Sequence, residues 1–282
     1  MRSLPHPARL LTIAVIAITV LLLTRPDSSA NRLVSHWRPG PLLSAPDQAA
    51  QQPDPPSPAA IAGAALPADQ FDISIDDGLY PDQRQPLTAD LQRVLAYVSD
   101  RFGSGPTARF KATVVRDDNC GLHGIAYTDI RDVQVFTCPN IGRDRAVAIL
   151  AHEFVHQLEQ DRYGPAHLSA DLILSEGMAT WGAGEYWLSG QPDFRSFVRE
   201  QRKSGLFLPL ATDYNGRGVA AMNALYYEWA SFVDFLIGTY GRAKFDQLYV
   251  SGHSAPGSAD YTGVYGKGLD VLEREWQAWL NT

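Results

Sequence analysis

Residues 152–156, His-Glu-Phe-Val-His, carry the strongest chemical signal in this chain. On a helix, His152 and His156 lie one turn apart on the same face, so their ring nitrogens can converge on one metal ion. Glu153 lies between them, where its carboxylate can take a proton from a water molecule beside the metal. A hydrolytic zinc site uses three protein ligands and keeps a fourth position for water, and Glu176 is the candidate third ligand. The pattern therefore predicts a Zn²⁺-dependent hydrolase, with peptide bonds as the expected target.

Helices are expected to carry these residues. The segment 145–160 contains no proline and is rich in helix-forming residues, and Gly164 and Pro165 follow it as a stop signal. Glu176 falls in a second helix-like segment, residues 170–185. Apolar periodicity predicts further helices over residues 87–102, 194–201, 222–240, 243–248 and 269–280. Strands are expected over residues 111–115, 124–127 and 133–136, the last two as a hairpin.

Two further segments resemble a known family. Residues 173–181, Ile-Leu-Ser-Glu-Gly-Met-Ala-Thr-Trp, are similar to the second metal motif of the gluzincins, the thermolysin-like clan of zinc metallopeptidases, and within it to the bacterial peptidase MA-like domains. Residues 226–236 resemble the helix that follows in those domains. The resemblance spans roughly residues 105–250 and implies an α+β, zincin-like domain, which is expected to occupy residues 68–282. Such a domain has a small N-terminal mixed sheet, the His-Glu-x-x-His helix and a mainly helical C-terminal half.

The resemblance also implies roles for individual residues. In gluzincins, a tyrosine or histidine from the helical half donates a hydrogen bond to the reaction's oxyanion, which here points to Tyr226, with Tyr227 and His253 as alternatives. The edge strand before the metal helix pairs with an extended substrate, so residues 124–127 either take this role or form an ordinary strand. Some thermolysin-like enzymes carry an aspartate four residues after the third ligand. Thr180 stands there in this chain, so the partner that orients the metal histidines stays open.

Three residue groups have plainer expected roles. His167, in the loop between the two ligand helices, is expected to be exposed to solvent, with a supporting role near the metal site as the alternative. Trp276, Trp279 and Leu280 are expected to be core or docking residues. The two cysteines, Cys120 and Cys138, are expected to form a disulfide, because an even count in an exported chain favours a bridge.

Charge and the N-terminal segment bear on partners and location. The chain has 24 Lys and Arg against 31 Asp and Glu, a net charge of −7, which argues against nucleic acid as a partner. Basic residues precede an uncharged run, residues 10–23, as in an export signal. Residues 1–30 are therefore expected to be a signal peptide or an uncleaved signal anchor that attaches the chain to a membrane. Residues 31–67 are expected to be a Pro/Ala-rich disordered linker.

The sequence thus predicts a zinc metallopeptidase that is secreted or membrane-anchored outside the cytoplasm and acts on peptides or proteins. An endopeptidase is favoured, because the Gly-Ala-Met-Glu-Asn-like run of the aminopeptidase branch is absent. The alternative is a catalytically degenerate peptidase-like domain, tethered outside the membrane, that binds zinc or a partner without turnover. The intact Glu153 favours catalysis, because binding alone needs no such base. Substrate specificity and oligomeric state stay open.

Overall fold

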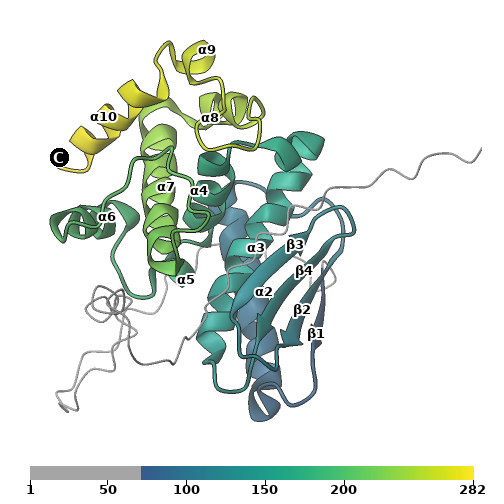
Figure 1. The fold of residues 1–282 in the computed structure, drawn as a ribbon. Helices are drawn as coiled ribbons and strands as arrows, with labels where there is room; N and C mark the ends of the chain where they lie inside the picture. Colours follow the sequence, from purple (N-terminus) through teal and green to yellow (C-terminus); the bar gives the residue numbers. More distant parts are fainter. Residues whose placement is uncertain (1–70) are drawn as a thin grey trace, which may run out of the picture.

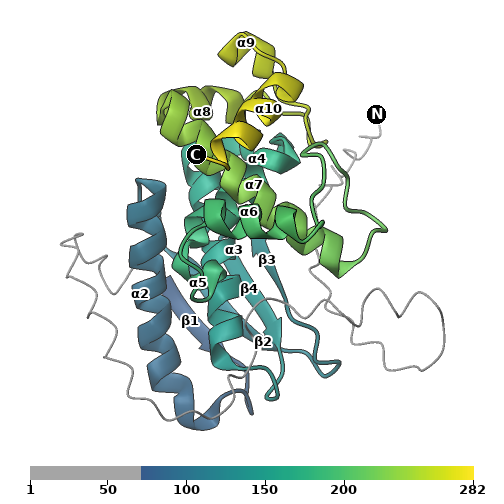
Figure 2. The same ribbon diagram turned by 90° about the vertical axis from the view of Figure 1, so that its left-hand side faces the viewer.

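The structure, a computed structural model, describes residues 71–282 (Figure 1). The predicted export segment and linker, residues 1–30 and 31–67, lie outside the described residues. A sheet with two long helices occupies the N-terminal part, and the remainder is helical (Figures 1 and 2). The predicted α+β class, with a small N-terminal mixed sheet and a mainly helical C-terminal half, is confirmed. Within residues 71–282, no helix is both long enough and apolar enough to span a membrane.

The sheet is mixed and small, as predicted. Its strands are β1 (Phe71–Ile75), β2 (Phe110–Arg116), β4 (Asp132–Thr137) and β3 (His123–Tyr127), in that spatial order. β1 and β4 both pair parallel with β2, whereas β3 and β4 form an antiparallel hairpin. This order leaves β3 at an edge of the sheet, where an extended chain could add to it. The sequence prediction missed β1.

One face of the sheet is covered by two helices, α2 (Arg84–Phe102) and α3 (Arg143–Tyr163), which also pack against each other. A short 3₁₀ turn, η1 (Pro81–Gln83), leads into α2. Phe154 of α3 meets the rings of Phe71 and Phe110 edge-on, at centroid distances of 5.9 and 5.5 Å. This contact fixes the helix that carries both candidate metal histidines onto the sheet.

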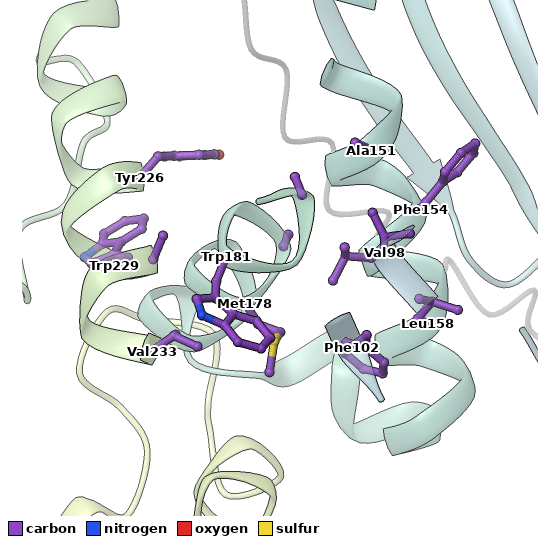
Figure 3. Packing of buried hydrophobic residues seen from close by; sticks show 14 of the residues in the cluster. Val98, Phe102, Ala151, Phe154, Leu158, Met178, Trp181, Tyr226, Trp229 and Val233 are labelled. Atoms are coloured by element: carbon purple, nitrogen blue, oxygen red, sulfur yellow. The ribbon is translucent and has the colours of Figure 1, made fainter. Parts of the chain in front are cut away.

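The C-terminal half begins with a turn of 3₁₀ helix, η2 (Gly164–Ser169), and α4 (Leu172–Ala183). α4 lies between α3 and α7 (Val219–Tyr240), and residues from all three helices share the core (Figure 3). Gly177 permits the close approach of α4 to α7, because a Cβ there would lie 2.8 Å from the Trp229 carbonyl oxygen. The remaining helices are α5 (Glu185–Leu188), α6 (Phe194–Lys203), α8 (Arg242–Tyr249), α9 (Tyr261–Tyr265) and α10 (Leu269–Trp279). Trp276 and Leu280 are fully buried and Trp279 packs against the core, as predicted.

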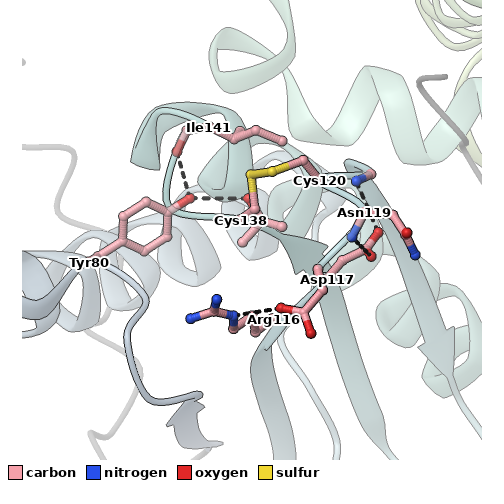
Figure 4. The surroundings of a disulfide bond; sticks show 10 residues. Tyr80, Arg116, Asp117, Asn119, Cys120, Cys138 and Ile141 are labelled. Carbon is pink, nitrogen blue, oxygen red and sulfur yellow. Dashed lines mark hydrogen bonds and ion pairs between the residues drawn. A yellow bond between two sulfur atoms is a disulfide. The ribbon is translucent and has the colours of Figure 1, made fainter. Parts of the chain in front are cut away.

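The predicted disulfide is present. Cys120, in the loop before β3, is bonded to Cys138, in the loop that leads from β4 into α3 (Figure 4). Tyr80 donates a hydrogen bond to the carbonyl oxygen of Ile141 at 3.0 Å in the same loop. Asp117 accepts hydrogen bonds from the backbone of the loop before β3, at 2.9 Å from both Asn119 N and Gly121 N. Covalent and hydrogen bonds therefore hold both loops beside the start of the metal helix.

Candidate metal centre

The three predicted metal ligands come together between α3 and α4. His152 Nε2 lies 3.2 Å from both His156 Nε2 and Glu176 Oε2, and His156 Nε2 lies 3.8 Å from Glu176 Oε2. Ligand atoms on a tetrahedral zinc ion, with bonds of about 2.0–2.1 Å, are about 3.3–3.4 Å apart. The three atoms are therefore spaced to hold one zinc ion.

Burial and protonation also suit these residues to zinc. His152 and Glu176 are each 1% exposed. Burial lowers the pKa of both His152 and His156, which keeps the rings neutral as nitrogen donors. Burial alone would raise the pKa of Glu176, but the hydrogen bond with His152 and the nearby His156 hold it below its usual value. A buried carboxylate beside two neutral imidazoles is a donor set that Zn²⁺ satisfies. The structure thus contains both features expected of a gluzincin, the α+β fold and the His–His–Glu cluster.

Glu153, the predicted base, lies between α3 and the edge strand. It is 4% exposed, and a Cβ built on Gly124 of β3 would lie only 2.3 Å from its Oε1. Burial raises the pKa of Glu153, and the nearby carboxylates of Glu176 and Glu159 raise it further. Such a carboxyl group can accept and hold a proton near neutral pH, while a bound cation would oppose the rise.

Of the three candidates for the oxyanion donor, the structure brings Tyr226 to the ligands. Its ring stacks on that of His152 at a centroid distance of 5.6 Å, and Figure 3 shows it extending from α7. The hydroxyl is buried and makes no hydrogen bond of standard geometry. Burial and the neighbouring Glu176 raise the pKa of Tyr226 well above its usual value, so the group stays protonated and able to donate.

The two alternative donors have other surroundings. The Tyr227 hydroxyl donates to the carbonyl oxygen of Trp187 at 3.2 Å, and its ring stacks on Phe197 at 4.0 Å. His253 is exposed, and its backbone N–H donates to Ser258 Oγ at 2.9 Å. Neither arrangement directs a side-chain donor toward the metal ligands.

The partners of the metal histidines include one that sequence reasoning missed. His156 Nδ1 lies 2.7 Å from Glu159 Oε2, and Glu159 is fully buried. An Nδ1–H that donates to this carboxylate leaves the lone pair on Nε2, the atom that faces the other ligands. His152 Nδ1 lies 3.4 Å from Thr180 Oγ1, so the residue that departs from the thermolysin-like pattern still contacts a metal histidine. Glu159 was identifiable, because it lies three residues after His156 on the same helix face.

The prediction that His167 is solvent-exposed is wrong. Its side chain is 10% exposed and lies in η2, with Nδ1 2.8 Å from the hydroxyl of Tyr249 and 3.7 Å from Glu159 Oε2. Burial lowers the pKa of His167 to about 4, so the ring is neutral near pH 7. The physical reason is tertiary: α8 packs over this turn and supplies Tyr249, a contact that the sequence of the turn does not encode.

Two aromatic residues near the ligands were also missed. The Trp187 ring lies 4.9 Å from that of His152 and 6.0 Å from that of Tyr226. Tyr214, from the loop before α7, lies 6.0 Å from the Tyr226 ring, and burial together with Glu176 raises its pKa. No motif marks either residue.

Comparison with known proteins gives limited similarity. No protein-family model matches the sequence, and no curated protein matches it. Among solved structures, the chain is similar to the M1 zinc metallopeptidase from Deinococcus radiodurans, with 21% identity and a TM-score of 0.43 over 73% of this chain and 47% of that one. A point mutant of the same enzyme gives 21% identity and a TM-score of 0.44 over 72% and 47%. This chain therefore spans less than half of that enzyme's length. The assignment of the centre depends on the distances and burial described above.

Proposed function

We propose that this chain is a zinc-dependent endopeptidase that acts outside the cytoplasm on peptides or proteins. The observation that carries the proposal is the buried cluster of His152, His156 and Glu176 at zinc-ligand spacing, with Glu153 beside it. The disulfide supports an oxidising compartment, and the basic residues before the uncharged run 10–23 support export.

Each residue of the cluster then has a chemical task. Zinc held by the two histidines and Glu176 would lower the pKa of a water molecule and polarise the scissile carbonyl. Glu153 accepts the proton of the attacking water and passes it to the departing amine. Tyr226 donates a hydrogen bond to the oxygen on which negative charge develops. Glu159 and Thr180 hold the histidine rings in orientation.

The edge strand supplies the means of holding an extended substrate. β3 has no neighbour on its outer side in the described sheet, and Gly124 places its backbone directly beside Glu153. A peptide that adds to β3 would bring one of its amide bonds next to the base and the metal ligands. This arrangement suits cleavage within a chain, because backbone pairing needs no free terminus.

The test measures zinc content and peptide hydrolysis on the same preparations of the full chain. Glu153→Gln should keep about one zinc per chain, because all three ligands remain, but should lose activity by a factor on the order of 10² or more. His156→Ala should lose most of the zinc and the activity together. A fully active Glu153→Gln protein would refute the mechanism. A folded, zinc-loaded wild-type protein that cleaves none of a proteome-derived peptide library would favour the degenerate binding domain instead.

A further inference from the structure

Arg145 is a half-buried cation without an anionic partner among residues 71–282. Its side chain takes part in none of the hydrogen bonds or ion pairs of that region, whereas Arg143, two residues earlier, pairs with Asp90 at 3.1 Å. Burial lowers the pKa of Arg145, and the one group that acts on it electrostatically is Tyr227. Burial raises the pKa of Tyr227 to about 12, so this neighbour is neutral near pH 7. A partly desolvated guanidinium with no counter-charge is costly unless a ligand completes it.

The position of Arg145 on α3 relates it to the metal centre. It precedes His152 by seven residues, which places the two within about 20° of the same helix face and about 10 Å apart along the axis. Its neighbour Tyr227 binds the backbone of Trp187, whose ring lies 4.9 Å from that of His152. Figure 2 shows α5, which carries Trp187, beside α3. Arg145 therefore lies along the same wall as the ligands, toward the N-terminal end of α3.

The edge strand sets the direction in which a substrate would run. β3 is parallel to α3, since Gly124 near its start lies beside Glu153 and Arg131 after its end pairs with Asp161, farther along α3. Antiparallel addition to an edge is the more stable pairing. A peptide added antiparallel to β3 runs from the C-terminal end of α3 toward the N-terminal end. Its residues after the scissile bond then extend toward Arg145.

We propose that Arg145 binds a substrate carboxylate on the carboxyl-terminal side of the scissile bond. An extended chain advances about 3.4 Å per residue, so the 10 Å between His152 and Arg145 corresponds to about three residues. The carboxylate is the side chain of Asp or Glu, or the free C-terminus, within three residues after the bond. A guanidinium pairs with either through two parallel hydrogen bonds. This inference rests on the proposed peptidase function and assigns its substrate class.

The first experiment uses matched peptides cleaved by the zinc-loaded full chain. One arm compares Asp with Asn at the first, second and third residues after the bond. The other arm compares free with amidated C-termini at the same distances. Wild-type kcat/KM should favour one acidic member by about tenfold or more, and the arm that shows this identifies the source of the carboxylate. In Arg145→Met the acid-to-amide ratio should fall to about one, while Arg145→Lys should be intermediate.

Taking the ratio within each protein cancels any general loss of folding or zinc. Arg274→Met is the matched control, because Arg274 lies on α10, is 66% exposed and pairs with Asp270. Its acid-to-amide ratio should equal that of wild type. A ratio that is unchanged in Arg145→Met overturns the inference, as does a preference for acidic residues before the bond.

A second experiment separates this inference from the peptidase proposal. Zinc-loaded Glu153→Gln binds the same labelled peptides without cleaving them, and fluorescence anisotropy gives their Kd values. The acidic member should bind about tenfold more tightly, and Arg145→Met in the same background should remove the difference. Selective binding by a wild-type protein that hydrolyses nothing would support Arg145 and refute the peptidase. Equal Kd values for the acidic and amide members would refute the role of Arg145 and leave the peptidase intact.

Discussion

Replacing Gly124 with alanine should inactivate the protein without removing its metal. The added Cβ would lie 2.3 Å from Glu153 Oε1, 2.5 Å from Cγ and 2.6 Å from Cδ. Because Cγ is obstructed as well as the carboxylate, rotation of the terminal group alone cannot relieve the contact. The backbone of Gly124 is not in the left-handed region, so alanine adds no backbone strain there. The substitution therefore acts on the position of Glu153.

The size of the effect follows from burial. Glu153 is 4% exposed, so a displaced carboxylate has little room and leaves the position from which it accepts a proton. Loss of a general base costs about 10²–10⁴ in rate, so kcat/KM should fall by about 10² or more. The three atoms nearest to the new methyl all belong to Glu153, and His152, His156 and Glu176 keep their own side chains, so zinc content should stay near one per chain.

The assay combines hydrolysis of a fluorogenic peptide with metal analysis of the same samples. Gly238→Ala is the control, because a Cβ at that exposed helical position meets no atom within 4 Å. It should leave activity unchanged and stabilise the fold by up to about 1 kcal/mol. In a Glu153→Gln background, Gly124→Ala should lower kcat/KM by a much smaller factor than it does alone, because both changes abolish the action of the same base. Full activity of Gly124→Ala would refute the placement of Glu153 as base, and loss of zinc with activity would show that the ligands moved instead.

Three further outcomes are expected. Glu159→Gln should weaken zinc binding about 10–100-fold in a chelator competition, because the substitution replaces the carboxyl group that orients the ring of His156, and an unchanged Kd would contradict its orienting role. Burial raises the pKa of Glu228 to about 8 from an ordinary 4.5, so between these values the folded chain keeps a proton that the unfolded chain releases. The free energy of unfolding should then fall by up to about 1.4 kcal/mol per pH unit from pH 5.5 to 7.5. In denaturant titrations, the free energy of unfolding of Glu228→Gln should fall less over this pH range than that of the wild type. Equal falls in the two proteins would exclude the raised pKa of Glu228. Replacing both Cys120 and Cys138 with serine opens a loop whose ends are 18 residues apart in sequence. The free energy of unfolding should fall by about 3 kcal/mol in the same assay, because the unfolded chain gains conformational freedom. A loss below about 1 kcal/mol would contradict this loop-entropy account.

Helices were predictable because their signal is local. The periodic segments 87–102 and 222–240 recur as α2 and α7 with only small changes at their ends. The hairpin β3–β4 was predictable for the same reason. β1 was not, although its Phe-Asp-Ile-Ser-Ile sequence alternates, because its parallel partner β2 follows only after the whole of α2. Parallel pairing across a helix leaves no trace in either strand alone.

The candidate site divides in the same way. His152, His156 and Glu159 lie three or four residues apart on one helix, so their place on a common face could be predicted from spacing alone. Trp187 and Tyr214 approach His152 and Tyr226 only through tertiary packing, so no spacing could reveal them. The error at His167 has the same origin, because its partner Tyr249 lies 82 residues away in sequence.

The third ligand depends on contacts that lie far from the histidine motif. Glu176 lies five residues after Asp171, the N-cap of α4, which accepts a hydrogen bond from Ile173 N at 3.0 Å. The same carboxylate accepts from Gly257 N, Ala259 N and the Tyr261 hydroxyl, each at 3.0 Å. A buried carboxylate that serves four donors fixes the start of α4 against the start of α9 and the segment before it. The histidines are thus positioned by the sheet and Glu176 by the C-terminal segment, so the three candidate ligands come together only where contacts from both halves of the domain meet.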